Sequence, residues 1–331
     1  VVSLQDALDE VLAEVGPRIA SPLAAAIARA RAGGARVDRL VLMTSGLLSY
    51  VPLHAAPFGR DGAQVTLLDD LEVTFAPSAR VYATACQRSR QVAPASRLAV
   101  VADTRPHTHP LPYAAIESVL AVRGLMPDSH VVLQHDRATL DAVQQAVTGA
   151  THVHFATHGH FRPEAPLGSH LELAGQEQVT LGDMLAAQWL AGTRLVTFSA
   201  CDTGLTDVRF LPDEALGLPA AGIRAGAACV IGSLWPVRDL VAALVMGQTY
   251  TALADGAASP AAALRRAQFW LRDVTIARLL DELDDVRRAM AESVTTGPAL
   301  DALLAALRAA DPETRPFAHP EYWGAWMATG A

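Results

Sequence analysis

Lysine is absent from this chain of 331 residues, so all 26 of its lysine-or-arginine positions are arginines. Together with the many alanines, this absence is typical of a GC-rich genome and does not indicate a function. Acidic residues outnumber arginines and give the chain a net charge of −8. Because no arginine cluster stands out over this acidic background, we expect no direct binding of nucleic acid.

Cysteines are also few, and Cys86, Cys201 and Cys229 are odd in number and widely spaced. This is not a disulfide framework, and it fits a reducing cytoplasm. No apolar run reaches the roughly 20 residues of a membrane span, and the first residues lack the features of a signal peptide. We therefore expect a cytoplasmic protein without membrane contact. Because the chain does not begin with methionine, we also expect it to be part of a longer protein.

What the sequence does contain is a pair of apolar runs, at 151–161 and 195–204, that each break at a polar turn with glycine. Buried parallel strands that deliver side chains at their carboxyl ends have this pattern. A cysteine attacks a carbonyl as its thiolate, so it needs a base, and His158 beside Cys201 on a neighbouring strand end would supply one. The backbone N–H groups of Gly159 and Cys201 could then hold the developing oxyanion.

Each of these residues also has a purely structural interpretation. A lone cysteine at a strand end is commonly a small buried apolar residue, and a lone histidine among apolar residues is commonly a hydrogen-bonded core residue. His152, His154 and His160 lie close enough along the chain for a metal site to be weighed. His152 and His154 share one face of a strand, and no cysteine or carboxylate stands at short ligand spacing, so we expect no metal.

The overall pattern is an alternation of strands and helices, which indicates a parallel sheet with right-handed crossovers. With 51 % hydrophobic residues, the chain can bury a large core as one big domain or two tightly packed halves. Near the start, apolar spacing predicts a helix over 3–15 that ends near Gly16-Pro17, and a second helix over 22–32. Further predicted elements are strands at 39–43, 97–102, 131–133, 170–173 and 229–235, a hairpin at 62–76, and helices at 78–87, 114–125, 139–147, 181–190, 213–225, 237–255, 259–272 and 276–310, the last of them either continuous or broken at Gly297-Pro298.

Several motifs occur in a fixed order along the chain. They are the strand ends Ala-Thr-His-Gly-His-Phe (156–161) and Ser-Ala-Cys-Asp-Thr-Gly (199–204), the segment 217–239, and shorter motifs at 48–54, 76–78 and 319–326. In these motifs the sequence resembles the CHAT domain, a caspase-like and separase-related cysteine peptidase module. The resemblance implies an α/β fold, a caspase-like three-layer sandwich whose mostly parallel central sheet is flanked by helices. It further implies an N-terminal pseudo-caspase-like half at 1–94 and a catalytic caspase-like half at 95–331, in one continuous region with a helical insertion near 276–316.

The resemblance also implies a function. It implies a cysteine endopeptidase that cleaves a dedicated protein substrate without a cofactor, with Cys201 as nucleophile and His158 as general base and then acid. Many relatives are effectors in bacterial defence or regulated cell death, which implies a sensor or activator protein as a second partner. The alternative is a catalytically silent scaffold or partner-binding domain of the same fold. A nucleotide-binding domain is not expected, because no glycine-rich loop follows the strand at 97–102.

Substrate choice is the least determined part of the predicted function. In caspase-like folds the strand and loop after the nucleophile line the pocket for the residue before the scissile bond, and here that loop carries Trp235 and Asp239. A carboxylate from Asp239 or Asp202 on the floor of this pocket would favour a basic substrate side chain. The alternative is that Asp239 caps the helix that follows it, because aspartate before an apolar helical run is a common N-cap.

Overall fold

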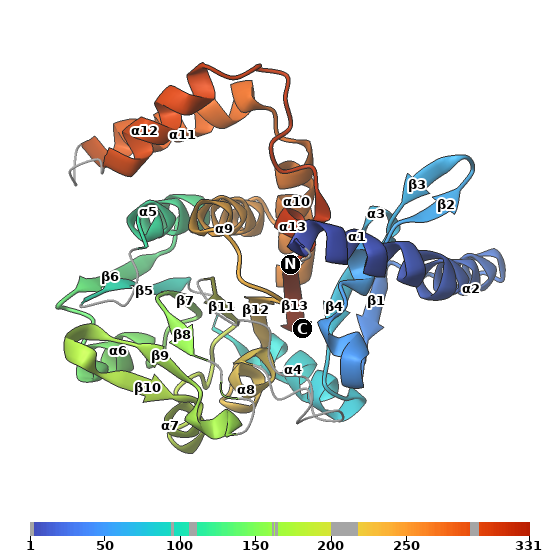
Figure 1. Ribbon diagram of the computed structural model, residues 1–331. Helices are drawn as coiled ribbons and strands as arrows, with labels where there is room; N and C mark the ends of the chain where they lie inside the picture. The colour runs from blue at the N-terminus through green and yellow to red at the C-terminus, as the bar shows by residue number, and fades with distance from the viewer. Residues whose placement is uncertain are drawn as a thin grey trace.

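The centre of the molecule is an eight-stranded sheet with helices on both faces, as Figure 1 shows for the computed structural model of the chain. The structure describes residues 3–93, 96–105, 111–160, 162, 165–199, 218–291 and 298–331. The strands lie in the order β1-β4-β13-β12-β11-β7-β5-β6. In chain order they are β1 (Arg39–Leu42), β4 (Glu72–Phe75), β5 (Arg97–Thr104), β6 (Ser129–His135), β7 (His152–Ala156), β11 (Leu195–Phe198), β12 (Cys229–Ser233) and β13 (Trp326–Gly330).

The sheet consists of two parallel blocks that meet between β12 and β13. The strands β12, β11, β7, β5 and β6 all run parallel to one another. β13 runs antiparallel to β12 but parallel to β4, which is in turn parallel to β1. The carboxyl ends of β7 and β11 therefore share one edge of the sheet, whereas β1 and β4 end at the opposite edge. β1 and β4 of the predicted N-terminal half continue the sheet of the catalytic half, and the boundary at residue 94 stays a prediction.

Helices cover both faces of this sheet and form two separate apolar clusters with it (Figure 1). The mostly parallel three-layer α/β sandwich predicted from the sequence is confirmed. One face carries α5 (Ala114–Leu125), α9 (Asp239–Ala254) and α10 (Pro260–Asp273); the other carries α4 (Ala79–Gln91), α6 (Leu140–Val147), α7 (Leu181–Ala186) and α8 (Leu218–Arg224).

The predicted helical insertion forms a further layer outside the sandwich. α11 (Ile276–Ala291) and α12 (Pro298–Arg308) lie above α5 and α9 in Figure 1. α11 turns a stripe of apolar residues inward, and Leu279, Leu283, Val286 and Met290 are all buried. A spacing of three to four residues places these side chains on one face of the helix, which explains why it packs as an added layer.

The helices α5 and α9 pack closely against each other because a glycine of each stands where they meet. A Cβ atom added to Gly124 would lie 2.9 Å from the carbonyl oxygen of Gly247, closer than van der Waals contact allows. α9 buries residues on all of its sides, so it is a core helix without a polar face.

The expected end of the first helix near Gly16-Pro17 is wrong. α1 (Leu4–Val15) continues through a π-helical segment (Gly16–Ala20) into α2 (Ser21–Ala32). Pro17 does not stop the helix, because the residues on both sides of the π-helical segment, Val15 and Ser21, keep right-handed helical backbone angles. Gly16 has a packing role instead, because a Cβ atom there would clash with the carbonyl oxygen of Pro57.

This continuous helix, Leu4–Ala32, is the one helix within the described ranges that is long and apolar enough to cross a membrane, by length and composition alone. Its first half buries Leu8 and Leu12 in the core of the molecule. His319 binds this half from the other end of the chain, with its Nε2 atom 3.1 Å from Asp9 Oδ1. The absence of membrane contact stays a prediction.

Two smaller sheets and a short helical segment complete the description. The predicted hairpin exists, but at β2 (Phe58–Arg60) and β3 (Ala63–Val65), followed by α3 (Leu67–Asp70) and β4. The strand predicted at 170–173 is β9 (His170–Glu172), which pairs with β8 (Gly159–His160) and β10 (Gln178–Thr180). The strand β13 was not predicted, and α13 (Pro320–Trp323) precedes it.

Candidate active site

His158 lies just past the carboxyl end of β7, two residues after Ala156, where the chain turns into β8. The residue is half-buried, and its backbone carbonyl accepts the N–H of Glu172 at 2.8 Å. This bond comes from β9, so the small sheet fixes the backbone that carries His158. The predicted position of His158 at a strand end is therefore what the structure shows.

The neighbouring strand β11 is held to β7 in a defined register. Phe155 of β7 stands opposite Phe198 of β11, and their rings stack 5.6 Å apart. Ser199 donates two hydrogen bonds to the carbonyl of Phe155, from its backbone N–H (3.1 Å) and its hydroxyl (3.2 Å). Cys201 and Asp202 follow directly, but both lie outside the residues that the structure describes.

Two threonines connect three strand ends around His158. The hydroxyl of Thr157 lies 2.7 Å from the carbonyl oxygen of Glu172 and 3.2 Å from that of His158. Thr104, at the end of β5, donates to the same Glu172 carbonyl at 3.1 Å. Both threonines are buried. Hydrogen bonds among buried groups are costly to break, so the ends of β5, β7 and β9 are fixed relative to one another.

Gly159 and His160 form the short strand β8, whose residues pair with Leu171 and His170. Gly159 is buried, whereas His160 is half-buried and places its Nε2 atom 2.6 Å from Glu172 Oε1. The rings of His160 and His170 stack with their centres 4.9 Å apart. His160 is thus engaged with a carboxylate and a second imidazole next to the site. No group of three potential metal ligands exists in the described part of the chain.

The two histidines within β7, His152 and His154, are buried. His152 is buried, and burial together with the nearby charge of Arg194 lowers its pKa to about 4, so the ring is neutral at pH 7. Its Nδ1 atom lies 3.0 Å from the hydroxyl oxygen of Thr151.

His154 belongs to a buried polar chain between the sheet and its helices. Its Nδ1 atom lies 3.1 Å from the Tyr250 hydroxyl, which lies 3.1 Å from the hydroxyl of Thr197 on β11. On the other side, Nε2 lies 3.1 Å from Glu117 Oε1 of α5, at an angle that does not satisfy a hydrogen bond, and both side chains are fully buried. Burial also raises the pKa of Tyr250, which stays a neutral phenol. These buried polar groups connect β7 and β11, the two strands that lead to the predicted catalytic residues.

Asp239 is the first residue of α9, and it does not cap that helix. Its Oδ2 atom accepts the backbone N–H of Tyr113 at 2.7 Å, at the N-terminus of α5. The Oδ1 atom is buried without a hydrogen-bond partner among the described residues. Burial, with the nearby charges of Glu117 and Asp103, raises the pKa of the Asp239 carboxyl to about 7. Asp239 therefore connects the N-termini of α5 and α9.

Trp235 follows β12 and is buried, with 6 % of its surface exposed. Its indole N–H donates to the carbonyl of Glu321 at 3.0 Å. The side chain thus binds the segment that leads into β13, and little of it is open to a substrate. Whether Trp235, Asp239 and Asp202 contact substrate stays a prediction.

The sequence motifs described above extend over nearly the whole chain. The family model of the CHAT domain matches residues 9–331. The chain belongs to the CHAT domain family. The resemblance inferred from the motifs is thereby confirmed, and no curated protein matches this CHAT chain.

Two solved structures are similar to this CHAT domain. The crystal structure of the Arg-specific cysteine proteinase gingipain R (RgpB) aligns with a TM-score of 0.45 and 9 % identity, over 78 % of this chain and 54 % of that chain. The complex of the Porphyromonas gingivalis RgpB pro- and mature domains aligns with a TM-score of 0.44 and 10 % identity, over 79 % and 55 %. The CHAT chain therefore spans about half the length of these two solved chains.

Sequence reasoning missed the residues that support His158 in the CHAT domain. Thr104 and Glu172 belong to none of the motifs, and Thr157 lies within the motif at 156–161 but, like other buried threonines, gave no sign of its role; Glu172 supports His158 through its backbone. The one available signal was the strand predicted at 170–173, between the two catalytic strands. Its antiparallel pairing with β8 follows from the turn after His158, which the sequence does not specify.

Proposed function

We propose that this CHAT domain is a cysteine endopeptidase in which Cys201 is the nucleophile and His158 the general base. The observation that supports this most is the register of β7 and β11. Phe155 and Phe198 are partners across the two strands, and Ser199 is bonded to Phe155. His158 follows Phe155 by three residues, and Cys201 follows Phe198 by three residues. Each residue of the proposed dyad thus comes three positions along the chain after one member of this strand pair.

The reaction has two halves in this proposal. His158 takes the proton of the Cys201 thiol, the sulfur attacks the carbonyl carbon, and the N–H groups of Gly159 and Cys201 hold the resulting oxyanion. The intermediate then collapses, the C–N bond breaks, and His158 gives the proton to the leaving amine. Water attacks the thioester with His158 again as base, which releases the acid and restores the thiol.

A peptidyl chloromethyl ketone tests this dyad before any natural substrate is known. In such a reagent an activated thiolate displaces chloride and forms a thioether. Because the chain has no lysine, trypsin places each cysteine in its own peptide: Cys86 in 81–88, Cys201 in 195–209 and Cys229 in 225–238. We expect mass spectrometry to find the adduct on 195–209. Cys229 is buried and its thiol pKa is raised by burial to about 12, so it should stay unmodified.

Iodoacetamide under denaturing conditions is the control, because it should modify all three peptides equally. An adduct on Cys86 alone, or none on 195–209 after prolonged incubation, would contradict the proposed nucleophile. The second outcome would favour the catalytically silent scaffold.

We propose a basic residue before the scissile bond, because the carboxylates of Asp239, Glu117 and Asp103 lie near one another beneath the site edge. In this proposal the substrate guanidinium reaches the Asp239 carboxylate, whose buried Oδ1 atom has no hydrogen-bond partner among the described residues, and pairs with it through charge-assisted hydrogen bonds. Losing one partner of such a pair costs on the order of 2–5 kcal/mol. Asp239→Asn should therefore reduce turnover of peptides with Arg at this position far more than turnover of peptides with an uncharged residue, measured on a peptide library.

The pH dependence of stability tests the raised pKa of Asp239, and the substrate preference then separates a substrate-binding role from a purely structural one. The folded-state pKa of Asp239 is about 7, above the usual value near 3.8, so the folded state binds the proton more tightly. Wild-type stability should then fall as the pH rises from about 4 to about 7, whereas the amide in Asp239→Asn stays neutral and can still accept the Tyr113 N–H. If Asp239→Asn changes only this pH dependence and leaves the substrate preference intact, Asp239 is structural. The exposed Asp255→Asn, at the other end of α9, is the matched control.

The resemblance to CHAT effectors supports a wider proposal about context. On this proposal the domain acts in the cytoplasm on one dedicated protein, within a bacterial defence or cell-death system, and a sensor or activator protein switches it on. The genes next to its own would test this, because such peptidases tend to be encoded beside their sensor and their target.

A further inference from the structure

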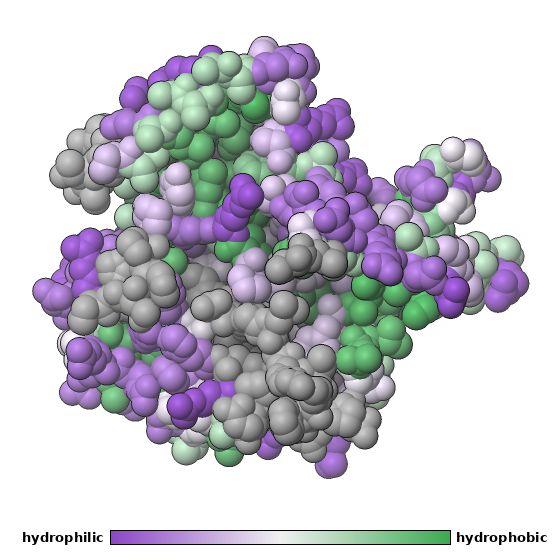
Figure 2. Space-filling model, viewed as in Figure 1, coloured by the Kyte–Doolittle hydropathy of each residue, from purple (hydrophilic) through white to green (hydrophobic). Residues whose placement is uncertain are grey.

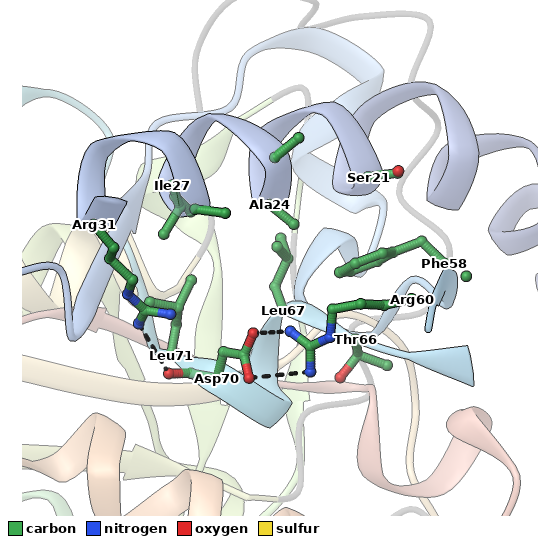
Figure 3. Close-up of a pocket in the computed structure, with 13 residues that line it drawn as sticks. Ser21, Ala24, Ile27, Arg31, Phe58, Arg60, Thr66, Leu67, Asp70 and Leu71 are labelled. Atoms are coloured by element: carbon green, nitrogen blue, oxygen red, sulfur yellow. Dashed lines mark hydrogen bonds and ion pairs between the residues drawn. The ribbon is translucent and has the colours of Figure 1, made fainter. Parts of the chain in front are cut away.

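A groove lined by residues between 21 and 71 has no part in the proposed peptidase reaction. α2 and the β2–β3 hairpin project from the molecule on the side away from β7 (Figure 1). Between them and α3 lies a groove of about 470 Å³, shown in Figure 3. Its apolar walls face each other across the groove: Ala24, Ile27 and Ala28 from α2, and Phe58, Leu67 and Leu71 from the other side.

The α2 wall is only partly covered by its own chain, because Ala24 and Ile27 pack against the core with part of their surface accessible, and Ala28 is exposed. No residue of α2 is buried, whereas α1, in the same continuous helix, buries Leu8 and Leu12. Figure 2 shows apolar residues on this side of the molecule, including the region below α2 over β1. After β1 along the chain, Met43, Leu47 and Leu48 have 46 %, 68 % and 39 % of their surfaces exposed. Exposed apolar surface that gathers on one side of a molecule marks interaction sites in soluble proteins.

The polar groups of the groove leave one positive charge without a carboxylate. Arg60 is paired with both carboxylate oxygens of Asp70, and Figure 3 shows this pair at the base of the groove. Arg31 instead donates to backbone carbonyls, those of Val37 at 2.9 Å and Asp70 at 3.5 Å. α2 contains no acidic residue. Within the part of the chain that the structure describes, the charge of Arg31 is therefore not neutralised.

We propose that this groove binds an amphipathic helix of another protein, with apolar anchors between α2 and α3 and an acidic side chain against Arg31. α2 has 12 residues, a length of about 18 Å, which matches about three turns of a partner helix. The volume admits a few anchoring side chains and not a whole helix, so the partner would lie along the mouth. Small alanines on α2 allow the partner backbone to come close.

A small polar ligand fits the groove less well. Sites for such ligands present several polar groups that converge on the ligand. Here the Asp70 carboxylate is used by Arg60, and Arg31 is already oriented by carbonyl groups. What remains is an apolar surface with one positive charge at its rim, which is the pattern for an acidic amphipathic helix.

The test uses a synthetic, fluorescein-labelled helical peptide of about 18 residues, with leucines at i, i+3, i+4 and i+7 and one flanking glutamate. Anisotropy titration should show saturable binding to the wild-type chain. Ala28→Glu places a charge on the apolar wall and should weaken binding by at least about tenfold. Ala30→Glu, on the same helix but outside the groove, is the matched control and should bind like the wild type. Both positions are exposed and glutamate is a good helix former, so both variants should fold.

A second pair of reagents tests the charge. Arg31→Gln should weaken binding of the glutamate peptide and leave binding of the same peptide with glutamine unchanged. Equal affinity of Ala28→Glu and Ala30→Glu, or no saturable binding to the wild type, overturns the proposal. Binding to phosphatidylserine vesicles that Ala28→Glu abolishes would assign α2 to a lipid surface instead. Self-association that Ala28→Glu abolishes in sedimentation would assign the groove to a second copy, and either result overturns the proposal as well.

Discussion

Replacing Cys201 by alanine is expected to reduce peptide cleavage to background. Nothing else in the proposed reaction forms the acyl intermediate, so the loss should approach the roughly 10⁶-fold seen when the nucleophile of a serine peptidase is removed. The measurement is the cleavage rate of the best peptide from a library, or of the natural substrate once it is known. The expected result does not depend on the specificity of the site, because the nucleophile acts on every substrate.

The other two cysteines provide the controls for this variant. Cys86 lies half-buried on α4, and Cys229 is buried at the start of β12. Cys86→Ala should keep full activity, and Cys229→Ala should lose stability only through the smaller side chain. A fully active Cys201→Ala variant, or complete loss of activity in a well-folded Cys86→Ala variant, would remove the basis of the assignment.

Replacing His158 by alanine is expected to lower the cleavage rate by about 10²–10⁴-fold, the usual contribution of a general base. The loss should appear in kcat, measured under conditions in which circular dichroism shows the variant to be folded, and the backbone carbonyl of His158 can still accept the N–H of Glu172. Labelling of Cys201 by the chloromethyl ketone should slow in parallel, since the thiol then lacks its base. Normal labelling in His158→Ala would show that another group activates the cysteine.

His154→Ala is the informative comparison, four residues earlier in the chain and within β7. His154 is fully buried against Glu117 and Tyr250, so its removal leaves a cavity and takes away the hydrogen-bond partner of the buried Tyr250 hydroxyl on that side. Such losses in a core cost a few kcal/mol, so the temperature of thermal unfolding should fall clearly. The fraction that stays folded should keep most of its activity. A His154→Ala variant that folds normally and is as inactive as His158→Ala would mean that the wrong imidazole was assigned.

Much of the parallel block formed by β12, β11, β7, β5 and β6 could be predicted from the sequence. The apolar runs that became β5, β7 and β11 are buried on both faces, and the helix predicted over 114–125 matches α5 over its full length. His158 could be placed at a strand end because the apolar run stops there. These features are local, so a single stretch of sequence carries all the information that they need.

What could not be predicted depends on contacts between distant segments. β13 reads as an aromatic motif followed by small residues, and it is a strand because β12 and β4 flank it. Asp239 has the sequence context of an N-cap for α9, yet its carboxylate binds the N-terminus of α5, which lies 126 residues earlier in the chain. The break expected at Gly16-Pro17 did not occur, and Gly16 packs there against the backbone of Pro57, a contact that the local sequence does not reveal.

The position of β13 has a consequence for how the protein is made. Residues 326–330 form the only strand that hydrogen-bonds to both β12 and β4, the inner strands of the two parallel blocks in the described sheet. A ribosome synthesises the chain from its N-terminus. All other strands of the sheet therefore leave the ribosome before β13 does. The sheet cannot become continuous until translation has passed residue 330. A CHAT domain built in this way is completed only after nearly all of this region has left the ribosome.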